Sequence, residues 1–364
     1  MEQQLPNFGK KPTKIQSIFL VILFSFIYIP SMVQLIGVGK DNTFIDNRIP
    51  QKFPKFPAKF GDIPKFKKEL SQFLQDNFGF RAELVKLNIL INLKIGVSSV
   101  PGLILGKEGW LFLKNDYAIL DQYRGINKFS NKELEMWVST LNHYRDWLDK
   151  QKIYFVVVVA PNQQTVYSEY MPNYANKVNP ETRTDQLAQY LKTSGSKINF
   201  IDLRGALISA KSKFPKFYLY NKYEGHWNQL GAFVAYEEIM RVLSSNFKEL
   251  NQLQISDYEI KQIKKTWAIP PLSEDSLTLV LKNNQNNNKK TKPYKVLFYG
   301  DSFGDEGLLP MLKASNLKVL NIESNWKPLP VEIIDKEKPD IVIFELVERY
   351  LARPLQLESI PANR

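Results

Sequence analysis

With 364 residues, the chain is too long for one small domain, and its hydrophobic content of 44% is ample for a packed globular core. The absence of cysteine excludes disulfides, thiolate metal sites and a cysteine nucleophile, and the presence of only two histidines argues against a zinc site. A net charge of +12 would suit a nucleic-acid partner, but the lysines are scattered and lack the signatures of nucleic-acid modules, so we expect no such partner.

The first predicted element is an uncharged apolar run at residues 15–38, which exceeds the ~20 residues that cross a bilayer. Lys10, Lys11 and Lys14 precede it, and basic residues favour the cytoplasmic side of a membrane segment. We therefore predict a cytoplasmic tail at 1–14, a transmembrane anchor at 15–38, and a catalytic domain on the periplasmic side of a bacterial inner membrane. A cleaved signal peptide is the alternative, disfavoured by the length of the run and the lack of a clear cleavage site.

A proline-punctuated segment follows at residues 39–65 and predicts an extended linker. The helical spacing of apolar residues over 66–96 then predicts two helices, broken near residues 77–79. Lysines over 52–68 predict a basic surface near anionic lipid headgroups, with attraction to an acidic polymer such as a uronate-containing polysaccharide as the alternative.

The rest of the chain alternates between strand and helix patterns. The run at 153–161 is apolar without alternation, which predicts a strand buried on both faces, as in a parallel sheet covered by helices. The asparagine-rich stretch at 282–292 is typical of a surface loop. Further patterns predict a hairpin at 104–113, strands at 199–203, 295–299, 317–323 and 340–344, and helices at 131–150, 184–194 and 228–243. This order predicts an α/β sandwich with a mainly parallel sheet.

Two short motifs contain the residue types of a serine hydrolase or acyltransferase site. His226 lies two residues after Glu224, and Ser302 lies in a Gly-Asp-Ser sequence directly after the strand predicted at 295–299. A serine hydroxyl needs a base within hydrogen-bond reach, and that base needs a third group to orient it. We therefore predict Ser302 as the nucleophile, His226 as its base and Glu224 as the orienting carboxylate.

Ligands bind at the carboxyl ends of strands in such a sheet, and Ser302 is expected there. The neighbouring glycines, Gly300 and Gly304, are expected where the backbone needs positive φ. Both motifs have a plainer alternative. Ser302 can be the N-cap of the following helix, and His226 can stack beneath Trp227 at a helix start.

Taken in order, five short blocks resemble the alginate O-acetyltransferase family, whose catalytic domain is similar to SGNH hydrolases. The blocks are Gly106–Phe112, Ala160–Asn162 with Val166 and Tyr167, Glu224–Ala232, Gly300–Phe303 and Glu345–Arg349. In that family the acid-x-His block precedes the serine block, the reverse of ordinary SGNH hydrolases, and this chain shows the same permuted order. The resemblance implies a three-layer SGNH hydrolase-like sandwich over residues 66–364, after the predicted transmembrane helix.

The resemblance assigns the same three roles to Ser302, His226 and Glu224. The family usually has aspartate where this chain has Glu224, and a longer carboxylate side chain can still reach the imidazole. The family also tends to carry a lysine near the position of Gln163 or Gln164, and neither residue can supply that positive charge.

For the oxyanion, the backbone N–H of Ser302 is the expected donor, and Asn162 and Arg349 are further candidates. The resemblance implies acetyl transfer through a Ser302 acyl-enzyme to hydroxyls of an exported polysaccharide. The chain lacks a nucleotide or coenzyme A signature, so we expect no cofactor and a donor that comes from elsewhere. The resemblance implies that this acetyl donor is a multi-pass membrane O-acyltransferase. The alternatives are a polysaccharide O-acetyl esterase, a non-catalytic polysaccharide-binding or assembly subunit, and a structural membrane-anchored protein whose serine and histidine never meet.

Overall fold

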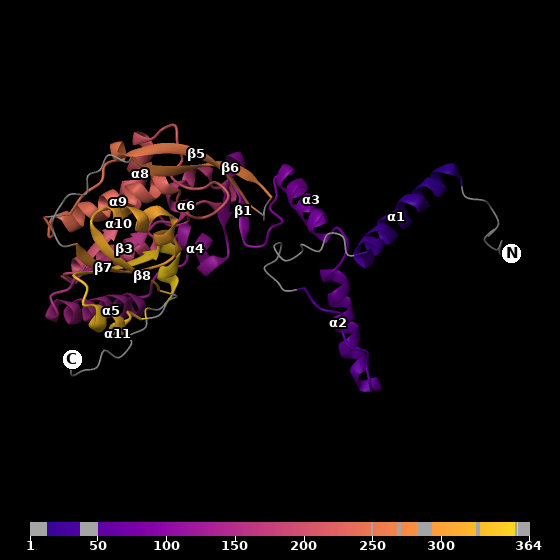
Figure 1. The fold of residues 1–364 in the computed structure, drawn as a ribbon, viewed down its shortest axis with the longest axis horizontal. Helices are drawn as coiled ribbons and strands as arrows, with labels where there is room; N and C mark the ends of the chain where they lie inside the picture. The colour runs from indigo at the N-terminus through magenta and orange to yellow at the C-terminus, as the bar shows by residue number, and fades with distance from the viewer. Residues whose placement is uncertain are drawn as a thin grey trace. The chain divides into compact units, whose positions relative to one another are not determined.

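The chain forms two compact units in the computed structural model (Figure 1). The first comprises Met1–Ile95 and Ala268–Pro271, and the second comprises Gly96–Trp267 and Leu272–Arg364. The structure describes residues 13–36, 50–248, 250–267, 271–282, 293–324, 328–353 and 355.

Among its described residues, the first unit contains the α-helices α1 (Lys14–Ile36), α2 (Ile63–Asp76) and α3 (Arg81–Lys94). The predicted break between two helices over 66–96 is confirmed, and Phe80 precedes α3 in the left-handed conformation with a φ of 59°. Neither α2 nor α3 contributes much to a core, because α2 has no buried residue and α3 has only two. The second compact unit begins at Gly96. The start of the catalytic domain at residue 66 stays a prediction.

The membrane-spanning helix predicted at residues 15–38 is not found as such. Helix α1 covers most of that run, with Pro30 inside it. Among the residues that the structure describes, however, no helix combines the length and the hydropathy needed to cross a membrane.

The second unit is built on a five-stranded sheet with the order β4-β3-β9-β7-β8, in which every neighbouring pair is parallel. The strands are β3 (Tyr154–Ala160), β4 (Asn199–Asp202), β7 (Tyr294–Gly300), β8 (Leu317–Glu323) and β9 (Ile341–Val347). The predicted parallel α/β sandwich is therefore confirmed. All five strands lie within a few residues of the ranges predicted from sequence.

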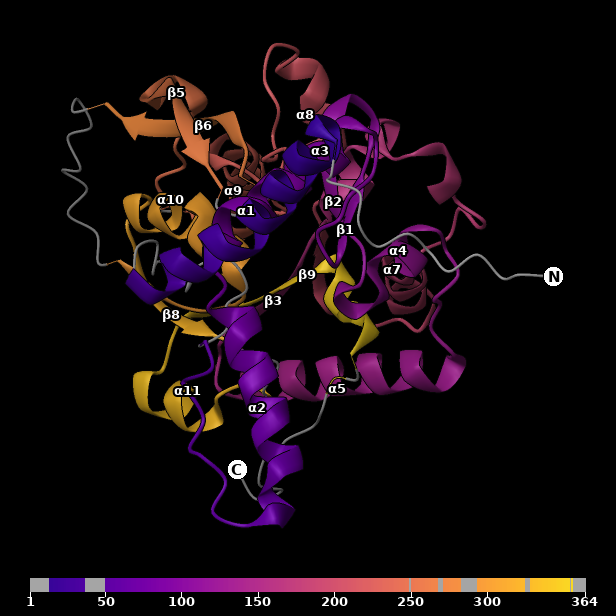
Figure 2. The ribbon, with the colours of Figure 1, turned by 90° about the vertical axis from the view of Figure 1, so that its right-hand side faces the viewer.

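Helices cover both faces of this sheet, as Figures 1 and 2 show with α9 and α10 on one side and α5 and α11 on the other. The apolar run of β3 explains this arrangement, because Val156 and Val158 pack in one core cluster while Val157 and Val159 pack in the other. One face is covered by α8 (Arg204–Lys213), α9 (Gln229–Ser244) and α10 (Leu309–Ala314), and the other by α5 (Asn131–Lys150), α7 (Arg183–Thr193) and α11 (Val331–Glu337). Two short helices are α4 (Ile119–Tyr123) and α6 (Gln163–Val166).

Two antiparallel hairpins lie outside the sheet. The first, β1 (Leu103–Leu105) with β2 (Leu111–Leu113), confirms the hairpin predicted at 104–113. The second, β5 (Tyr258–Thr266) with β6 (Ser273–Leu281), was not predicted from sequence, and Figure 2 shows it on the α9 side of the sheet. Most of β5 is exposed and lysine-rich, so it lacks the alternation that marks a half-buried strand. The loop predicted at 282–292 lies outside the described residues beyond Lys282.

Candidate active site

Ser302 lies where it was predicted, directly after the carboxyl end of β7. Its side chain is exposed, and a helical run begins at this residue and continues to Ala314, with a π-helical stretch at Gly304–Leu308. The Nε2 atom of His226 lies 2.7 Å from the Ser302 Oγ. This distance is within hydrogen-bond reach, so the predicted proximity of base and nucleophile is confirmed.

Glu224 lies on the opposite side of the imidazole, with its Oε1 in contact with the Nδ1 of His226. Its second oxygen, Oε2, accepts a hydrogen bond of 3.1 Å from the Asn221 side-chain amide and lies 3.8 Å from the Lys265 Nζ. Burial raises the pKa of Glu224, but the contact with His226 and the positive charges of His226 and Lys265 outweigh it, so the pKa is lowered overall. Glu224 is therefore ionised at neutral pH and can hold the imidazole in one orientation.

A closed loop holds Glu224 and His226 together. An antiparallel bridge joins Tyr220 to Trp227, and the Asn221 N–H donates to the His226 carbonyl at 3.0 Å. Trp227 is fully buried and its indole N–H donates to the carbonyl of Phe303 at 3.0 Å, which ties the loop to the turn that carries the nucleophile.

The imidazole of His226 contacts the ring of Phe303, with centroids 4.8 Å apart. Ser302 is not the residue that caps the helical run, because Asp301 Oδ1 accepts the Phe303 N–H at 2.9 Å, as an N-cap side chain does. The structure therefore does not place Ser302 as the N-cap, and its hydroxyl lies against the His226 imidazole.

The expectation of positive φ at Gly300 and Gly304 is wrong, since the positive φ of this segment belongs to Gly307, at 112°. The two glycines are instead required by close packing. A Cβ at Gly300 would lie 2.3 Å from Phe298 Cε1, and one at Gly304 would lie 2.5 Å from the same atom. The Phe298 ring thus demands glycine on both sides of the Asp-Ser pair.

The two candidate oxyanion residues lie at the same edge of the sheet, after β3 and β9. Arg349 donates from Nη1 to Asn162 Oδ1 at 3.4 Å and from Nε to Asp116 Oδ2 at 2.7 Å. Its guanidinium also lies over the ring of Phe303, 5.7 Å from the centroid. Both side chains are buried, and within the described part of the chain no hydrogen bond joins either of them to Ser302.

The two glutamines at the position of the family's lysine have structural contacts. Gln163 donates to the carbonyl of Asn221 and Gln164 to that of Leu113, each at 2.6 Å. Gln163 therefore supports the loop that carries Glu224. Over the described ranges, no group of three or more histidine or acidic side chains is arranged to hold a metal ion.

Two contacts of Glu224 were missed at the level of sequence. Asn221 precedes Glu224 by three residues, a spacing that carries no signal of its own, and Lys265 belongs to the unpredicted strand β5. Lys265 also lies 3.6 Å from Glu306 Oε2, on the π-helical stretch after the nucleophile, and 4.7 Å from the ring centroid of Trp267. The contact of Lys265 with Glu224 could have been predicted only if the β5–β6 hairpin had been recognised from the sequence.

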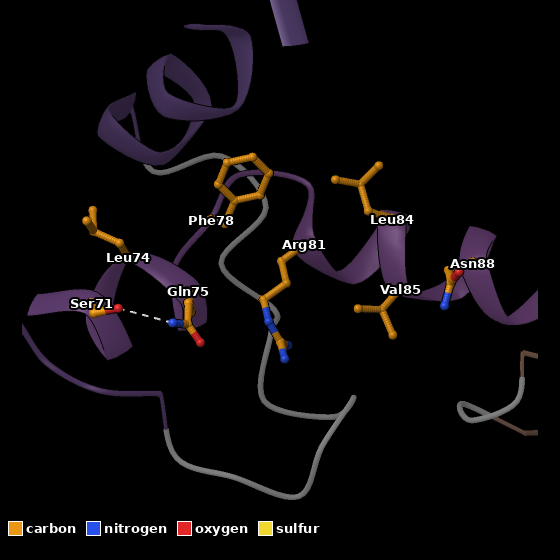
Figure 3. Close-up of a pocket in the computed structure, with 8 residues that line it drawn as sticks. All are labelled: Ser71, Leu74, Gln75, Phe78, Arg81, Leu84, Val85 and Asn88. Carbon is orange, nitrogen blue, oxygen red and sulfur yellow. Dashed lines mark hydrogen bonds between the residues drawn. The ribbon is translucent and has the colours of Figure 1, made fainter. Parts of the chain in front are cut away.

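A separate pocket of about 610 Å³ lies between α2 and α3 in the first unit (Figure 3). Its walls contain none of the predicted site residues, and the Gln75 amide donates to Ser71 Oγ within it at 3.1 Å. The lining residues are Ser71, Leu74, Gln75, Phe78, Arg81, Leu84, Val85 and Asn88. Ser302, His226 and Glu224 lie outside this pocket.

Comparison with known proteins connects this geometry to a family. The profile of the family described as "SGNH hydrolase-like domain, acetyltransferase AlgX" matches residues 103–296. A probable alginate O-acetylase AlgJ of Pseudomonas putida is 24% identical over 146 residues, which is 40% of this chain and 34% of the relative. The protein of the same name from Pseudomonas aeruginosa is 25% identical over 158 residues, 43% of this chain and 35% of the relative. The matches thus span about a third of the length of these relatives.

Two solved structures share the fold. The O-acetyltransferase domain of Pseudomonas putida AlgJ is similar with a TM-score of 0.51 and 18% identity, covering 72% of this chain and 97% of that domain. Bacillus cereus PatB1 is similar with a TM-score of 0.50 and 14% identity, covering 70% of this chain and 99% of that structure. Together with the family profile, they confirm the SGNH hydrolase-like α/β fold that was predicted from sequence.

Proposed function

This chain belongs to the AlgX family of SGNH hydrolase-like acetyltransferases, and from that membership we propose that it moves an acetyl group through acetyl-Ser302 to hydroxyls of an exported polysaccharide. The observation that carries the proposal is the line of contacts from Glu224 through His226 to Ser302, with 2.7 Å between His226 Nε2 and Ser302 Oγ. Nucleophile, base and orienting carboxylate in this order are the requirements of serine-dependent acyl transfer.

In the first step, His226 Nε2 accepts the proton of the Ser302 hydroxyl while Oγ attacks the carbonyl carbon of an acetyl donor. Glu224 stabilises the resulting imidazolium at Nδ1. The tetrahedral oxyanion is met by the backbone N–H of Ser302, at the start of the helical run, with Asn162 and Arg349 as the further candidates. Collapse of the oxyanion breaks the bond to the leaving group, which takes the proton from His226, and leaves acetyl-Ser302.

In the second step, a sugar hydroxyl replaces the leaving group. His226 accepts its proton, the sugar oxygen attacks the acetyl carbonyl, and the bond to Ser302 Oγ breaks as His226 returns the proton to Oγ. The products are the O-acetylated sugar and free enzyme. Transfer requires that the sugar reach acetyl-Ser302 before water does.

An O-acetyl esterase is the second candidate, and one observation favours it. Ser302 is exposed, so water can approach an acetyl group on its Oγ. Transfer and hydrolysis share the first step, and they differ in what accepts the acetyl group. A bound polysaccharide that covers Ser302 would give transfer, and an uncovered site would give hydrolysis.

The partners belong to the proposal as well. The relatives named alginate O-acetylases support a polysaccharide acceptor, and their match covers only about a third of their length. We propose a multi-pass membrane O-acyltransferase as the acetyl donor, which is the donor that the family resemblance implies. We also propose attachment to the bacterial inner membrane with the catalytic unit on the periplasmic side, on the strength of Lys10, Lys11 and Lys14 before the apolar run at 15–38.

Membrane fractionation tests the location. The full chain is expected to remain with the membrane pellet after carbonate extraction, and protease added to spheroplasts is expected to digest the catalytic unit. Recovery of a soluble product trimmed near residue 38 would contradict the anchor.

Partition of the acetyl group tests the activity. The full chain is incubated with 4-nitrophenyl acetate and an acidic oligosaccharide, and acetate and O-acetyl sugar are measured separately. Transfer predicts acetylated oligosaccharide from the wild type and none from Ser302→Ala, with Ser139→Ala, an exposed serine on α5, as the matched control. Free acetate alone would identify an esterase, and equal product from Ser302→Ala would remove the serine mechanism.

A further inference from the structure

Glu345 is a buried carboxyl group that the acyl-transfer steps above do not use. It lies on β9, the middle strand of the sheet, and its side chain has no exposed surface. Acidic residues are almost never fully buried unless they are paired. Its presence beneath the site therefore requires a physical account.

Glu345 contacts the turn that carries the nucleophile. Its Oε2 accepts the backbone N–H of Asp301 at 3.0 Å, and its carboxyl group lies within hydrogen-bond reach of the Asp301 side chain. A Cβ on Gly300 would lie 2.7 Å from the same Oε2. Glu345 is thus packed directly against Gly300 and Asp301, the two residues before Ser302.

Asp301 is held from the other side. Its Oδ1 accepts the N–H of Phe303 at 2.9 Å, and its Oδ2 accepts the N–H of Val347 at 2.8 Å. Its carboxylate therefore links the start of the helical run to the end of β9. Two backbone donors favour the charged form of Asp301, whereas Glu345 accepts only one.

The second oxygen of Glu345 favours a neutral group. Within the described part of the chain, Oε1 is buried and has no hydrogen-bond partner. A buried, ionised carboxylate needs partners for both oxygens, and two neighbouring carboxyl groups can form a hydrogen bond with each other only if one of them is protonated. Burial raises the pKa of both acids, and the charge of Asp301 adds to the rise at Glu345. Asp301 accepts two backbone N–H groups and Glu345 only one, so the proton is better placed on Glu345.

We propose that Glu345 is a positioning residue, a neutral carboxylic acid that shares its proton with Asp301 and so fixes the Ser302 turn to the central strand. The proposal rests on the proposed function only where activity is the readout. When two neighbouring carboxyl groups share one proton, one group stays protonated while the other is ionised, and the pair loses its two protons at different pH values. Here the pair contacts the turn that contains Ser302, and its proposed role is to fix the backbone of that turn.

Other charged or titratable groups act on this pair. Arg349 favours the ionised form of both acids, and His226 favours that of Asp301. Tyr220 and Tyr350 lie close enough that their own pKa values respond to Glu345 and Asp301, respectively. His226 takes part in the proposed acyl transfer, so a second readout that is independent of catalysis is needed.

The test uses Glu345→Gln and Glu345→Leu in the full chain. Glutamine keeps the acceptor for the Asp301 N–H and donates to the Asp301 carboxylate at every pH, so hydrolysis of 4-nitrophenyl acetate is expected within about threefold of wild type. Leucine removes both contacts, and a displaced serine is expected to lower kcat by roughly 10²-fold with KM little changed. Glu323→Gln, an exposed glutamate on β8, is the control.

Unfolding as a function of pH separates the protonation from the packing. A folded pKa raised above the unfolded value of about 4.3 contributes stability that is full below that pH and is lost as pH rises through the folded pKa. The unfolding free energy of the wild type relative to Glu345→Gln is therefore expected to fall as pH rises. The difference in unfolding free energy between the wild type and Glu323→Gln is expected not to change with pH.

Each outcome decides the matter. A pH-independent difference between wild type and Glu345→Gln would show that Glu345 carries no shared proton and would overturn the proposal. Full kcat in Glu345→Leu, in a protein whose Ser302→Ala variant is inactive, would overturn the positioning role. Inactivity of the wild type itself would count against the proposed function alone, because the unfolding series would still report on the pair.

Discussion

The central sheet and the β5–β6 hairpin hold the two halves of the site in different ways. The sheet positions Ser302, the proposed nucleophile, and every residue of β9 and most of β7 are buried there. The hairpin supports the loop of the base through polar contacts. Ser276 donates to Asn221 Oδ1 at 2.7 Å, and Glu274 accepts the N–H of Lys222.

This difference separates stability from activity. Apolar burial is the main source of folding free energy, so changes in the sheet should unfold the protein. Polar contacts of the hairpin contribute less to folding, yet they decide where Glu224 lies. Changes there should lower activity while the fold persists.

The largest effect is expected at the carboxylate that the hairpin helps to hold. Glu224→Gln should lower acetyl transfer by roughly 10²–10⁴-fold, because an amide cannot stabilise the imidazolium. Glu224→Asp, with the family's usual side chain, should stay within about tenfold of wild type in kcat/KM. Full activity of Glu224→Gln would show that another group orients His226.

The lowered pKa of Glu224 also predicts a pH dependence of stability. A depressed folded pKa contributes stability that is present above the unfolded value of about 4.3 and is lost as pH falls through the folded pKa. The gap in unfolding free energy between wild type and Glu224→Gln should therefore close on acidification. A gap that widens at low pH would contradict the charged contact with His226.

A matched pair of apolar substitutions tests the two regions by stability. Leu297→Ala, in the fully buried part of β7, should cost about 2–5 kcal/mol of unfolding free energy. Ile263→Ala, on β5 with 44% of its surface exposed, should change it by less than about 0.5 kcal/mol. Denaturant melts of both variants measure the difference. Equal costs would remove the distinction between sheet and hairpin.

Ser276→Ala should leave the buried Asn221 Oδ1 without its donor and lower the unfolding free energy by about 1–3 kcal/mol. The loop that carries Glu224 should shift as a result, so kcat/KM should also fall. Ser273→Ala, on the exposed start of the same strand, is the control. Identical kinetics of the two variants would mean that the hairpin does not support the base.

The smallest effect is expected at Lys265, whose side chain is 29% exposed. Lys265→Met should lower kcat/KM by less than about fivefold, and added salt should shrink the difference from wild type. Lys264→Met, on the same strand with 68% of its side chain exposed, should have no effect. A tenfold loss that persists at high salt would assign Lys265 a larger role than screening allows.

The same two regions show how far sequence alone could go. The strands of the sheet were predictable because their apolar runs are unbroken and their residues pack on both faces, as in β3. The proximity of Ser302, His226 and Glu224 was predictable because histidine is scarce and because Ser302 follows such a strand. Neither inference needed a long-range contact.

The hairpin could not be predicted for the opposite reason. The exposed, charged face of β5 leaves no alternation to read, and the partners of Ser276 and Lys265 are far away in sequence. Glu345 carried no sequence signal for its contact with Asp301, because a glutamate inside an apolar strand does not reveal what it faces. Glycine was expected at positions 300 and 304 because of positive φ, whereas the structure requires it there because the Phe298 ring is too close for a Cβ. The sequence does not show this contact.

Direct detection of the acyl-enzyme tests the central claim. The full chain is mixed with 4-nitrophenyl acetate, quenched in acid and digested, and the peptide that contains Ser302 is examined by mass spectrometry. In the wild type, one acetyl group on Ser302 is predicted, and no acetylated peptide is predicted for Ser302→Ala or His226→Gln. In Glu224→Gln, the acetylated fraction of Ser302 is higher than in the wild type if the substitution slows deacylation more than acylation. Acetyl groups found only on lysines, with an unmodified Ser302 at every time point, would contradict the serine mechanism.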